Sequence, residues 1–150
     1  MIKTTDVTAI GNAIVDVVTT VDEDFLIDHG IGKGAMTLIN AEQLQSLLPK
    51  TRGAKIISGG SAANTIVGFS MLGGSGAYIG KVKNDAAGNA FKKDLKDLGV
   101  SYTTTSNSSG PATAQCLVFV TEDAQRSMAT YLGACVSFCL LYTSDAADET

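Results

Sequence analysis

The amino-acid sequence predicts an α/β fold in which a mainly parallel sheet is covered by helices. Short apolar segments rich in β-branched residues alternate along the chain with segments whose apolar residues recur at helical spacing. Residues 112–121 and 126–132 favour two strands separated by a short turn, which is typical of a β-hairpin. Because a hairpin is antiparallel, some strands should lie outside the parallel layer.

The composition indicates one folded domain and argues against several classes of binding partner. Of the 150 residues, 45% are hydrophobic and 17% are charged, and the formal net charge is −4. The apolar content excludes a disordered chain, and the negative charge argues against nucleic acid as a partner. No stretch reaches the roughly 18 apolar residues of a membrane span, and the N-terminus lacks a signal-peptide pattern. Since the three cysteines complete no metal-binding spacing, we expect a cytoplasmic protein with no membrane partner and no metal site of its own.

The first strand carries two candidate site residues. Val7 to Val18 is rich in β-branched residues and predicts a buried strand with a bulge where Gly11 and Asn12 interrupt it. Asp16 lies on or near this strand. A carboxylate in such a run is costly to bury without a partner. Asp16 therefore either pairs with a cation, binds ligand hydroxyls or reaches water at the end of the strand.

The following segment predicts two short helices around a strand. Residues 22–29 favour a helix that ends at Gly30, and residues 35–39 favour a strand. Asn40 can cap a helix over residues 41–48, because three leucines of that segment fall on one side of it.

A strand, a glycine turn and a helix then follow in direct succession. Residues 55–58 predict a short apolar strand, and a helix-like run begins at Ser61, with Gly59 and Gly60 between them. Glycines let the backbone approach a ligand, and a helix N-terminus offers unpaired N–H groups, so the turn suits an anion or a hydroxyl-rich ligand. Asn64 would lie within the first helical turn and could hydrogen-bond to the same ligand. The alternative is an ordinary glycine turn in which Ser61 caps the helix.

The clearest helix is expected over residues 85–98, after a strand at 76–82. Its apolar residues form one stripe, and Gly99 supplies the C-cap. The charged residues on the other side are interpreted as solvated surface: Lys92, Lys93, Asp94, Lys96 and Asp97.

Four motifs in register resemble the N-terminal half of the PfkB family, the ribokinase-like sugar and nucleoside kinases. They are GNAIVD at 11–16, KGAMTLI at 33–39, GGSAANT at 59–65 and GKVKNDAAG at 80–88. The resemblance extends from about Val7 to Ala134. The sequence, notably its GNAIVD motif, is most similar to the adenosine-kinase branch and its bacterial sugar-kinase relatives.

The resemblance implies a partial ribokinase-like three-layer α/β/α fold with a small β-sheet lid. Members of the family use ATP and Mg²⁺ to phosphorylate a primary alcohol of a sugar or nucleoside, which would be the small-molecule partner. Carried over by position, the residues expected to bind substrate hydroxyls are Asn12, Asp16, Gly59, Gly60 and Asn64. Arg126 would lean toward the transferred phosphate when the lid closes, or else is a solvent-facing arginine of the hairpin.

The resemblance covers only part of such a kinase, so residues 1–135 are expected to form a truncated domain. The general base and the ATP site would belong to a C-terminal half, and no motif for it follows Leu132. The fragment is therefore expected to be inactive. Residues 136–150 depart from the family pattern, and LLYTSDAADE at 140–149 resembles translated sequencing-adapter read-through. We interpret these residues as a non-native tail; the alternative is a genuine divergent C-terminus.

Two other functions stay open on the sequence. One is a noncatalytic domain that binds a sugar or nucleoside. The other is a dinucleotide-binding module, which would place its glycine fingerprint at GGSAANT, although the spacing differs and no acidic residue follows at a strand end. A homodimer that pairs through the lid is a further expectation, because some relatives pair in this way.

Overall fold

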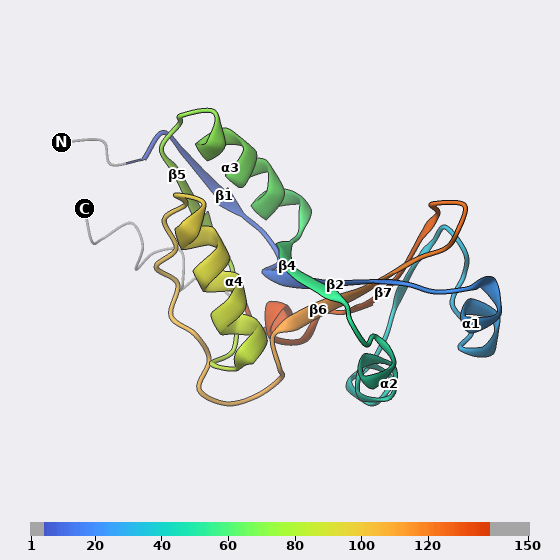
Figure 1. Ribbon diagram of the computed structural model, residues 1–150. Coiled ribbons are helices and arrows are strands. Elements are labelled where there is room, and N and C mark those ends of the chain that lie inside the picture. The colour runs from blue at the N-terminus through green and yellow to red at the C-terminus, as the bar shows by residue number, and fades with distance from the viewer. Residues whose placement is uncertain (1–4, 139–150) are drawn as a thin grey trace.

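The computed structural model describes residues 5–138. Within this range the chain forms two sheets: a parallel pair of strands that carries two helices, and a larger mixed sheet that carries two others. The larger sheet extends away from the smaller one (Figure 1), and we call these two parts the lid and the core. This arrangement confirms the predicted α/β class.

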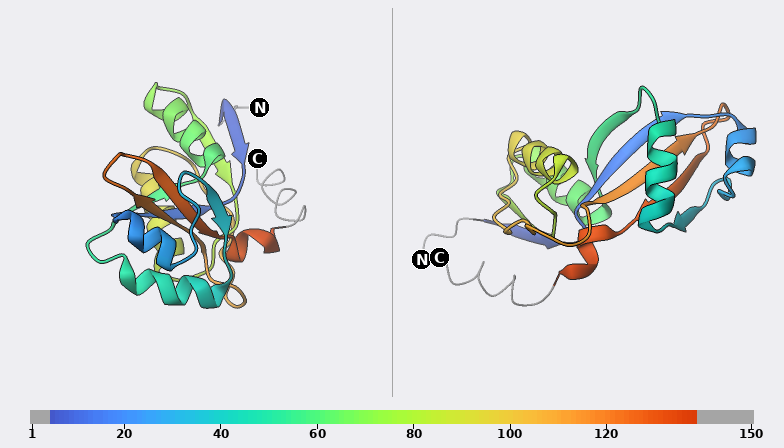
Figure 2. Two further views of the ribbon diagram at one scale, coloured as in Figure 1. Left: turned by 90° about the vertical axis from the view of Figure 1, so that its right-hand side faces the viewer. Right: turned by 90° about the horizontal axis from the view of Figure 1, so that it is seen from below.

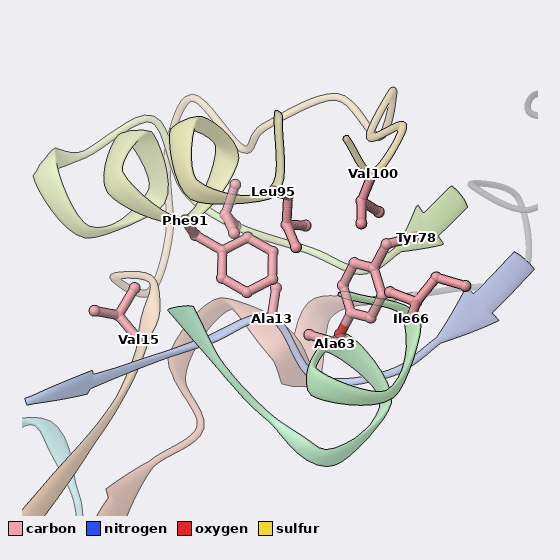
Figure 3. Close-up of a cluster of buried hydrophobic side chains, with 9 residues drawn as sticks. Ala13, Val15, Ala63, Ile66, Tyr78, Phe91, Leu95 and Val100 are labelled. Atoms are coloured by element: carbon pink, nitrogen blue, oxygen red, sulfur yellow. The ribbon is translucent and has the colours of Figure 1, made fainter. Parts of the chain in front are cut away.

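The core is built on two strands and two helices. Strand β1 (Val7–Ile10) pairs in parallel with β5 (Gly76–Ile79), and the helices are α3 (Ser61–Met71) and α4 (Ala86–Asp97). Tyr78 of β5 lies between the two helices (Figure 3). The apolar cluster that joins these elements consists of Ala13, Val15, Ala63, Ile66, Tyr78, Val82, Phe91, Leu95 and Val100.

The lid sheet has the strand order β3-β7-β6-β2-β4. Its strands are β2 (Ile14–Thr20), β3 (Met36–Leu38), β4 (Lys55–Gly59), β6 (Ala114–Val120) and β7 (Arg126–Tyr131). The predicted hairpin is confirmed, because β6 and β7 pair antiparallel. Strands β2 and β6 pair in parallel, whereas β2 and β4 pair antiparallel.

Two short helices cover one face of the lid sheet (Figure 2). Helix α1 (Glu23–Asp28) is capped by Asp22, and α2 (Ala41–Leu47) has the predicted Asn40 cap in a full capping box with Gln43. A 3₁₀ turn, η1 (Leu48–Lys50), follows α2. The cluster beneath the helices consists of Val17, Leu26, Ile31, Leu44, Leu47, Leu117, Phe119 and Ala129.

The structure corrects two predictions about the strands. The segment from Val7 to Val18 is not one bulged strand, because β1 belongs to the core and β2 to the lid. The chain changes sheets at Gly11, where a Cβ atom would lie 2.8 Å from Cβ of Ala62, so only glycine fits this crossing. Strand β4 also lies in the lid, antiparallel to β2, and is not part of a parallel layer.

Helix α4 joins the core to the lid through two aspartates. Asp85 caps α4 by accepting from the N–H of Gly88, and it also accepts from the N–H and the hydroxyl of Thr113 at 2.9 and 2.7 Å, just before β6. Asp94 accepts from the N–H of Ser58 in β4 at 2.8 Å. The interpretation of Asp94 as solvated surface was therefore wrong: its carboxylate is partly buried against the lid.

No helix among the described residues is both long and apolar enough to cross a bilayer.

Asp85→Ala should lower the free energy of unfolding by about 2 kcal/mol, because a helix cap and two further hydrogen bonds are lost together. Asp97→Ala is the control, since Asp97 forms only an exposed ion pair with Lys93 on the same helix and should cost under about 0.5 kcal/mol. Denaturant titration at neutral pH would measure both, and equal losses would contradict the prediction.

The same residue should make stability depend on pH. Burial disfavours the charged carboxylate, but hydrogen bonds from Thr113 and Gly88 outweigh it, so the pKa of Asp85 lies below its ordinary value of 3.8. A depressed pKa stabilises the fold above the unfolded-state pKa, and this contribution disappears as the pH falls through the folded-state pKa. Unfolding free energies measured from pH 6 down to pH 2 should therefore fall less steeply below about pH 4 in Asp85→Ala than in the wild type.

Candidate functional site at the junction of lid and core

The five predicted substrate-binding residues lie at the junction between the lid and the core. Asn12 is exposed in the segment that joins β1 to β2, and Asp16 is half-buried on β2. The glycine pair ends β4 beside β2, because Gly59 pairs with Ile14 in the sheet register. Asn64 is exposed in the first turn of α3, and its N–H donates to the carbonyl oxygen of Gly60 at 2.9 Å.

The carboxylate of Asp16 lies directly against Gly59. A Cβ atom at position 59 would be 2.3 Å from Cγ of Asp16 and 2.4 Å from each carboxylate oxygen, so any side chain there would displace the carboxylate. Burial raises the pKa of Asp16 above its ordinary value. Among residues 5–138, no hydrogen bond or ion pair reaches this carboxylate. Both oxygens can therefore accept hydrogen bonds from neighbouring hydroxyls of a ligand.

Gly60 allows the lid strand to turn into α3. Its φ of +96° is in the left-handed region, and a Cβ atom there would lie 2.7 Å from the carbonyl oxygen of Asn12. Gly60 is also the N-cap residue, so Ser61 is the first helical residue and not the cap considered above. Because glycine has no side chain to accept from them, the first-turn N–H groups of α3 have no side-chain cap, and they begin directly after the glycine pair that contacts Asp16 and Asn12.

The lid face opposite α1 and α2 continues from Asp16 as an apolar surface. Residues in register across a sheet share a face, and the row through Asp16 consists of Ile57, Asp16, Cys116, Thr130 and Leu38. The next row on this open face contains Val18, Val118, Met128 and Met36. Leu38 and Met36, at its margin, are 60% and 55% exposed.

One hydrogen bond on the open face fixes the residue beside Asp16. The hydroxyl of Thr130 donates to Sγ of Cys116 at 3.2 Å, and burial raises the pKa of this thiol. Cys116 therefore presents a neutral, weakly polar surface next to the Asp16 carboxylate.

Arg126 lies on the lid away from the glycine pair. It begins β7 in register with Val120, and it is exposed. Thr130, in the row of Asp16, is four positions along the strand, which corresponds to about 13 Å. Arg126 and Thr130 face the same side because their separation is even. The structure therefore brings together Asn12, Asp16, Gly59, Gly60 and Asn64, and leaves Arg126 at the far end of the open face.

Sequence reasoning missed two contributors to this region. Tyr78 is 1% exposed, its hydroxyl has no hydrogen-bond partner among the described residues, and it ends beneath Gly11. Burial raises the pKa of its hydroxyl. In the sequence, Tyr78 looks like any aromatic residue of an apolar strand, so its place beneath Gly11 could not be predicted. The open face itself was signalled only by the alternation of residues along β6 and β7.

The described residues show no group of three or more His, Cys, Asp or Glu side chains arranged to hold a metal ion. Cys116 and Cys135 are free and buried. Cys139 and most of the predicted tail lie outside the described residues, and residues 133–137 form a 3₁₀ turn.

Solved structures with the same fold include kinases of two kinds. The adenosine kinase from Sinorhizobium meliloti is 48% identical with a TM-score of 0.84, and the match covers 91% of this chain and 42% of that one. A probable sugar kinase from Rhizobium etli CFN 42 is 47% identical with a TM-score of 0.84, covering 90% of this chain and 41% of that one.

Curated relatives and the family match agree with these structures. The probable fructokinase-6 (chloroplastic) of Arabidopsis thaliana is 34% identical over 98 residues, which are 60% of this chain and 26% of that protein. The fructokinase of Escherichia coli is 30% identical over 94 residues, 62% of this chain and 31% of that protein. The chain thus spans less than half the length of these relatives. Since residues 5–138 match the pfkB family carbohydrate kinases, the chain belongs to the PfkB family.

Proposed function

We propose that this chain supplies the substrate-binding half and the lid of a kinase that transfers the γ-phosphate of ATP to a hydroxymethyl group of a sugar or nucleoside. The observation that carries the proposal is the Asp16 carboxylate, which is half-buried, lacks a hydrogen-bond partner in the described chain and lies against Gly59. A buried acceptor of this kind is costly unless a ligand donates to it. Two adjacent sugar hydroxyls match its two oxygens, and the N–H groups at the start of α3, which have no side-chain cap, follow directly after the glycine pair.

The open face of the lid favours a nucleoside over a free sugar. A free sugar carries hydroxyls that need polar partners, whereas apart from Thr130 and Lys55 the side chains in the two rows beside Asp16 are apolar or a thiol, and Cys116 and Val118 among them are buried. A flat apolar surface of this kind suits a base attached to the sugar, with the ribose hydroxyls at Asp16. The relatives named above include both an adenosine kinase and fructokinases.

ATP and Mg²⁺ are expected cofactors of a longer parent protein. Among the described residues, no group of three or more His, Cys, Asp or Glu side chains is arranged to hold the cation. The general base is likewise expected outside this chain, and the inactivity of the fragment stays a prediction. So does a role for Arg126 at the phosphate, since its place at the far end of the open face would require movement of the lid.

Assembly and location also stay predictions. Helices α1 and α2 occupy one face of the lid sheet, so a homodimer formed through the lid would have to use these helices, the open face or a sheet edge. A cytoplasmic location is expected from the cysteine pattern alone.

A noncatalytic sugar- or nucleoside-binding domain is the second candidate, because the five proposed ligand-binding residues all lie within the described chain. A dinucleotide-binding module is not favoured. Its glycine fingerprint requires a strand of a parallel sheet before the helix, whereas β4 is antiparallel to β2.

The kinase proposal predicts the sequence of the parent gene. Its longer reading frame should contain, downstream of Leu132, a glycine-rich turn that ends in an aspartate, and the purified parent should phosphorylate adenosine or a hexose with ATP. Coupled ADP-release assays would measure this. A parent without that turn, or tight NAD binding in place of phosphoryl transfer, would overturn the proposal.

Asp16→Ala should weaken the binding of adenosine to the chain by roughly 10- to 100-fold, because a hydrogen bond to a charged acceptor is worth about 1.5–3 kcal/mol. Calorimetry with adenosine, ribose and fructose measures this effect. Asp24→Ala, which removes an exposed carboxylate from α1, is the matched control and should change nothing. Because burial raises the pKa of Asp16, affinity should also fall as the pH is lowered towards this raised pKa, where the carboxylate becomes protonated. Binding that survives Asp16→Ala would remove the central assignment.

Gly59→Ala should reduce ligand affinity at least about tenfold, because the added methyl group would overlap the Asp16 carboxylate and displace it. Gly68→Ala on α3 is the control, since a Cβ atom there meets nothing within 4 Å and alanine favours the helix. The control should bind normally and unfold at a slightly higher temperature. A Gly59→Ala variant that binds like the wild type would show that the ligand does not use Asp16 in the position described.

A further inference from the structure

We propose that Asp94 of α4 is a positioning residue for the ligand site: it holds the end of β4, and therefore the glycine pair, against Asp16. The proposal rests on the proposed function, because its effect is on ligand affinity. Asp94 does not touch the site itself. It acts through the hydrogen bond from the N–H of Ser58, which is 2.8 Å from Oδ2 and joins residues 36 positions apart.

The position of β4 in the sheet explains why this hydrogen bond matters. Strand β4 is at the edge of the lid, and within residues 5–138 it has a strand partner only on the β2 side. In an antiparallel pair, alternate N–H groups point to the partner strand and away from it. The N–H of Ser58 points away, towards α4, and would have no strand acceptor without Asp94. Ser58 immediately precedes Gly59, so a shift of its backbone moves the glycine that contacts the Asp16 carboxylate.

Within the described chain, a single hydrogen bond joins the end of β4 to α4. A cavity of about 520 Å³ lies between the N-terminal half of α4 and the lid, lined by alanines of that half and by Val15, Val17 and Ile56, whereas Asp94 and Ser58 lie outside it. Across the described residues, no second hydrogen bond joins α4 to β4. The other attachment of α4 to the lid, from Asp85 to Thr113, is at the opposite end of the helix and holds β6. The end of β4 therefore depends on Asp94 for its hydrogen bond to α4.

Adenosine binding to the full chain, measured by calorimetry, tests the proposal with matched variants. Asp94→Ala should weaken binding by roughly tenfold, whereas Asp94→Asn, which keeps an acceptor oxygen, should stay within about twofold of the wild type. Ser58→Pro removes the donor at an edge position where proline is tolerated and should match Asp94→Ala. Ser58→Ala keeps the N–H and should bind normally. The double variant Asp94→Ala with Ser58→Pro should be no weaker than either single variant, because both remove the same interaction.

Two further measurements separate positioning from general destabilisation. The amide proton of Ser58 should resonate downfield in the wild type and in Asp94→Asn, and should lose that shift in Asp94→Ala. Asp97→Ala controls for loss of an α4 carboxylate and should leave both affinity and the amide shift unchanged.

The outcomes are distinct. Wild-type affinity in Asp94→Ala, with a lower unfolding temperature, would overturn the positioning role and leave the proposed function intact. Equal weakening by Asp97→Ala would also overturn it. A wild-type chain that binds no adenosine, ribose or fructose would refute the proposed function, and the positioning role with it.

Discussion

The backbone of the lid meets the backbone of the core at distances that only glycine permits, and the rest of the structure depends on this close approach. A Cβ atom at Gly60, between β4 and α3, would lie 2.7 Å from the carbonyl oxygen of Asn12, between β1 and β2. Gly60 has a positive φ. Because the chain passes between the two sheets without a spacer, residues from separate elements converge where the sheets join.

The convergence places the Asp16 carboxylate in a half-buried position, where a charged group is ordinarily costly. Asp16 is on a strand whose neighbouring positions, Val15 and Val17, are buried in two different apolar clusters. Burial raises the pKa of Asp16, so the folded state disfavours the ionised carboxylate relative to the unfolded chain. A position that destabilises the folded chain is typical of a binding site, because there the ligand, and not the protein, supplies the hydrogen bonds to the polar group.

Local chemistry was predictable from the sequence, and the pairing of distant segments was not. The Asn40 cap and the hairpin each depend on a few neighbouring residues, and the structure confirms them. The five residues that the family resemblance suggested as substrate-binding lie together at the junction, and their role stays a prediction. The change of sheet at Gly11 and the place of β4 in the lid depend on contacts between residues far apart in the chain, which periodicity cannot show. The prediction that Asp94 is solvated was wrong for the same reason. Its hydrogen-bond partner is on another element, so its position on the polar side of α4 indicated only contact with solvent.

The β4 edge has a consequence for association with other chains. An edge strand offers N–H and carbonyl groups to any extended segment, and Ile56, 60% exposed on β4, would make such an addition more favourable. The carboxylate on α4 already occupies one of the outward N–H groups and places a negative charge beside the edge. The same side chain that orders β4 within the molecule thus also obstructs strand addition from outside, and discourages the growth of intermolecular sheets.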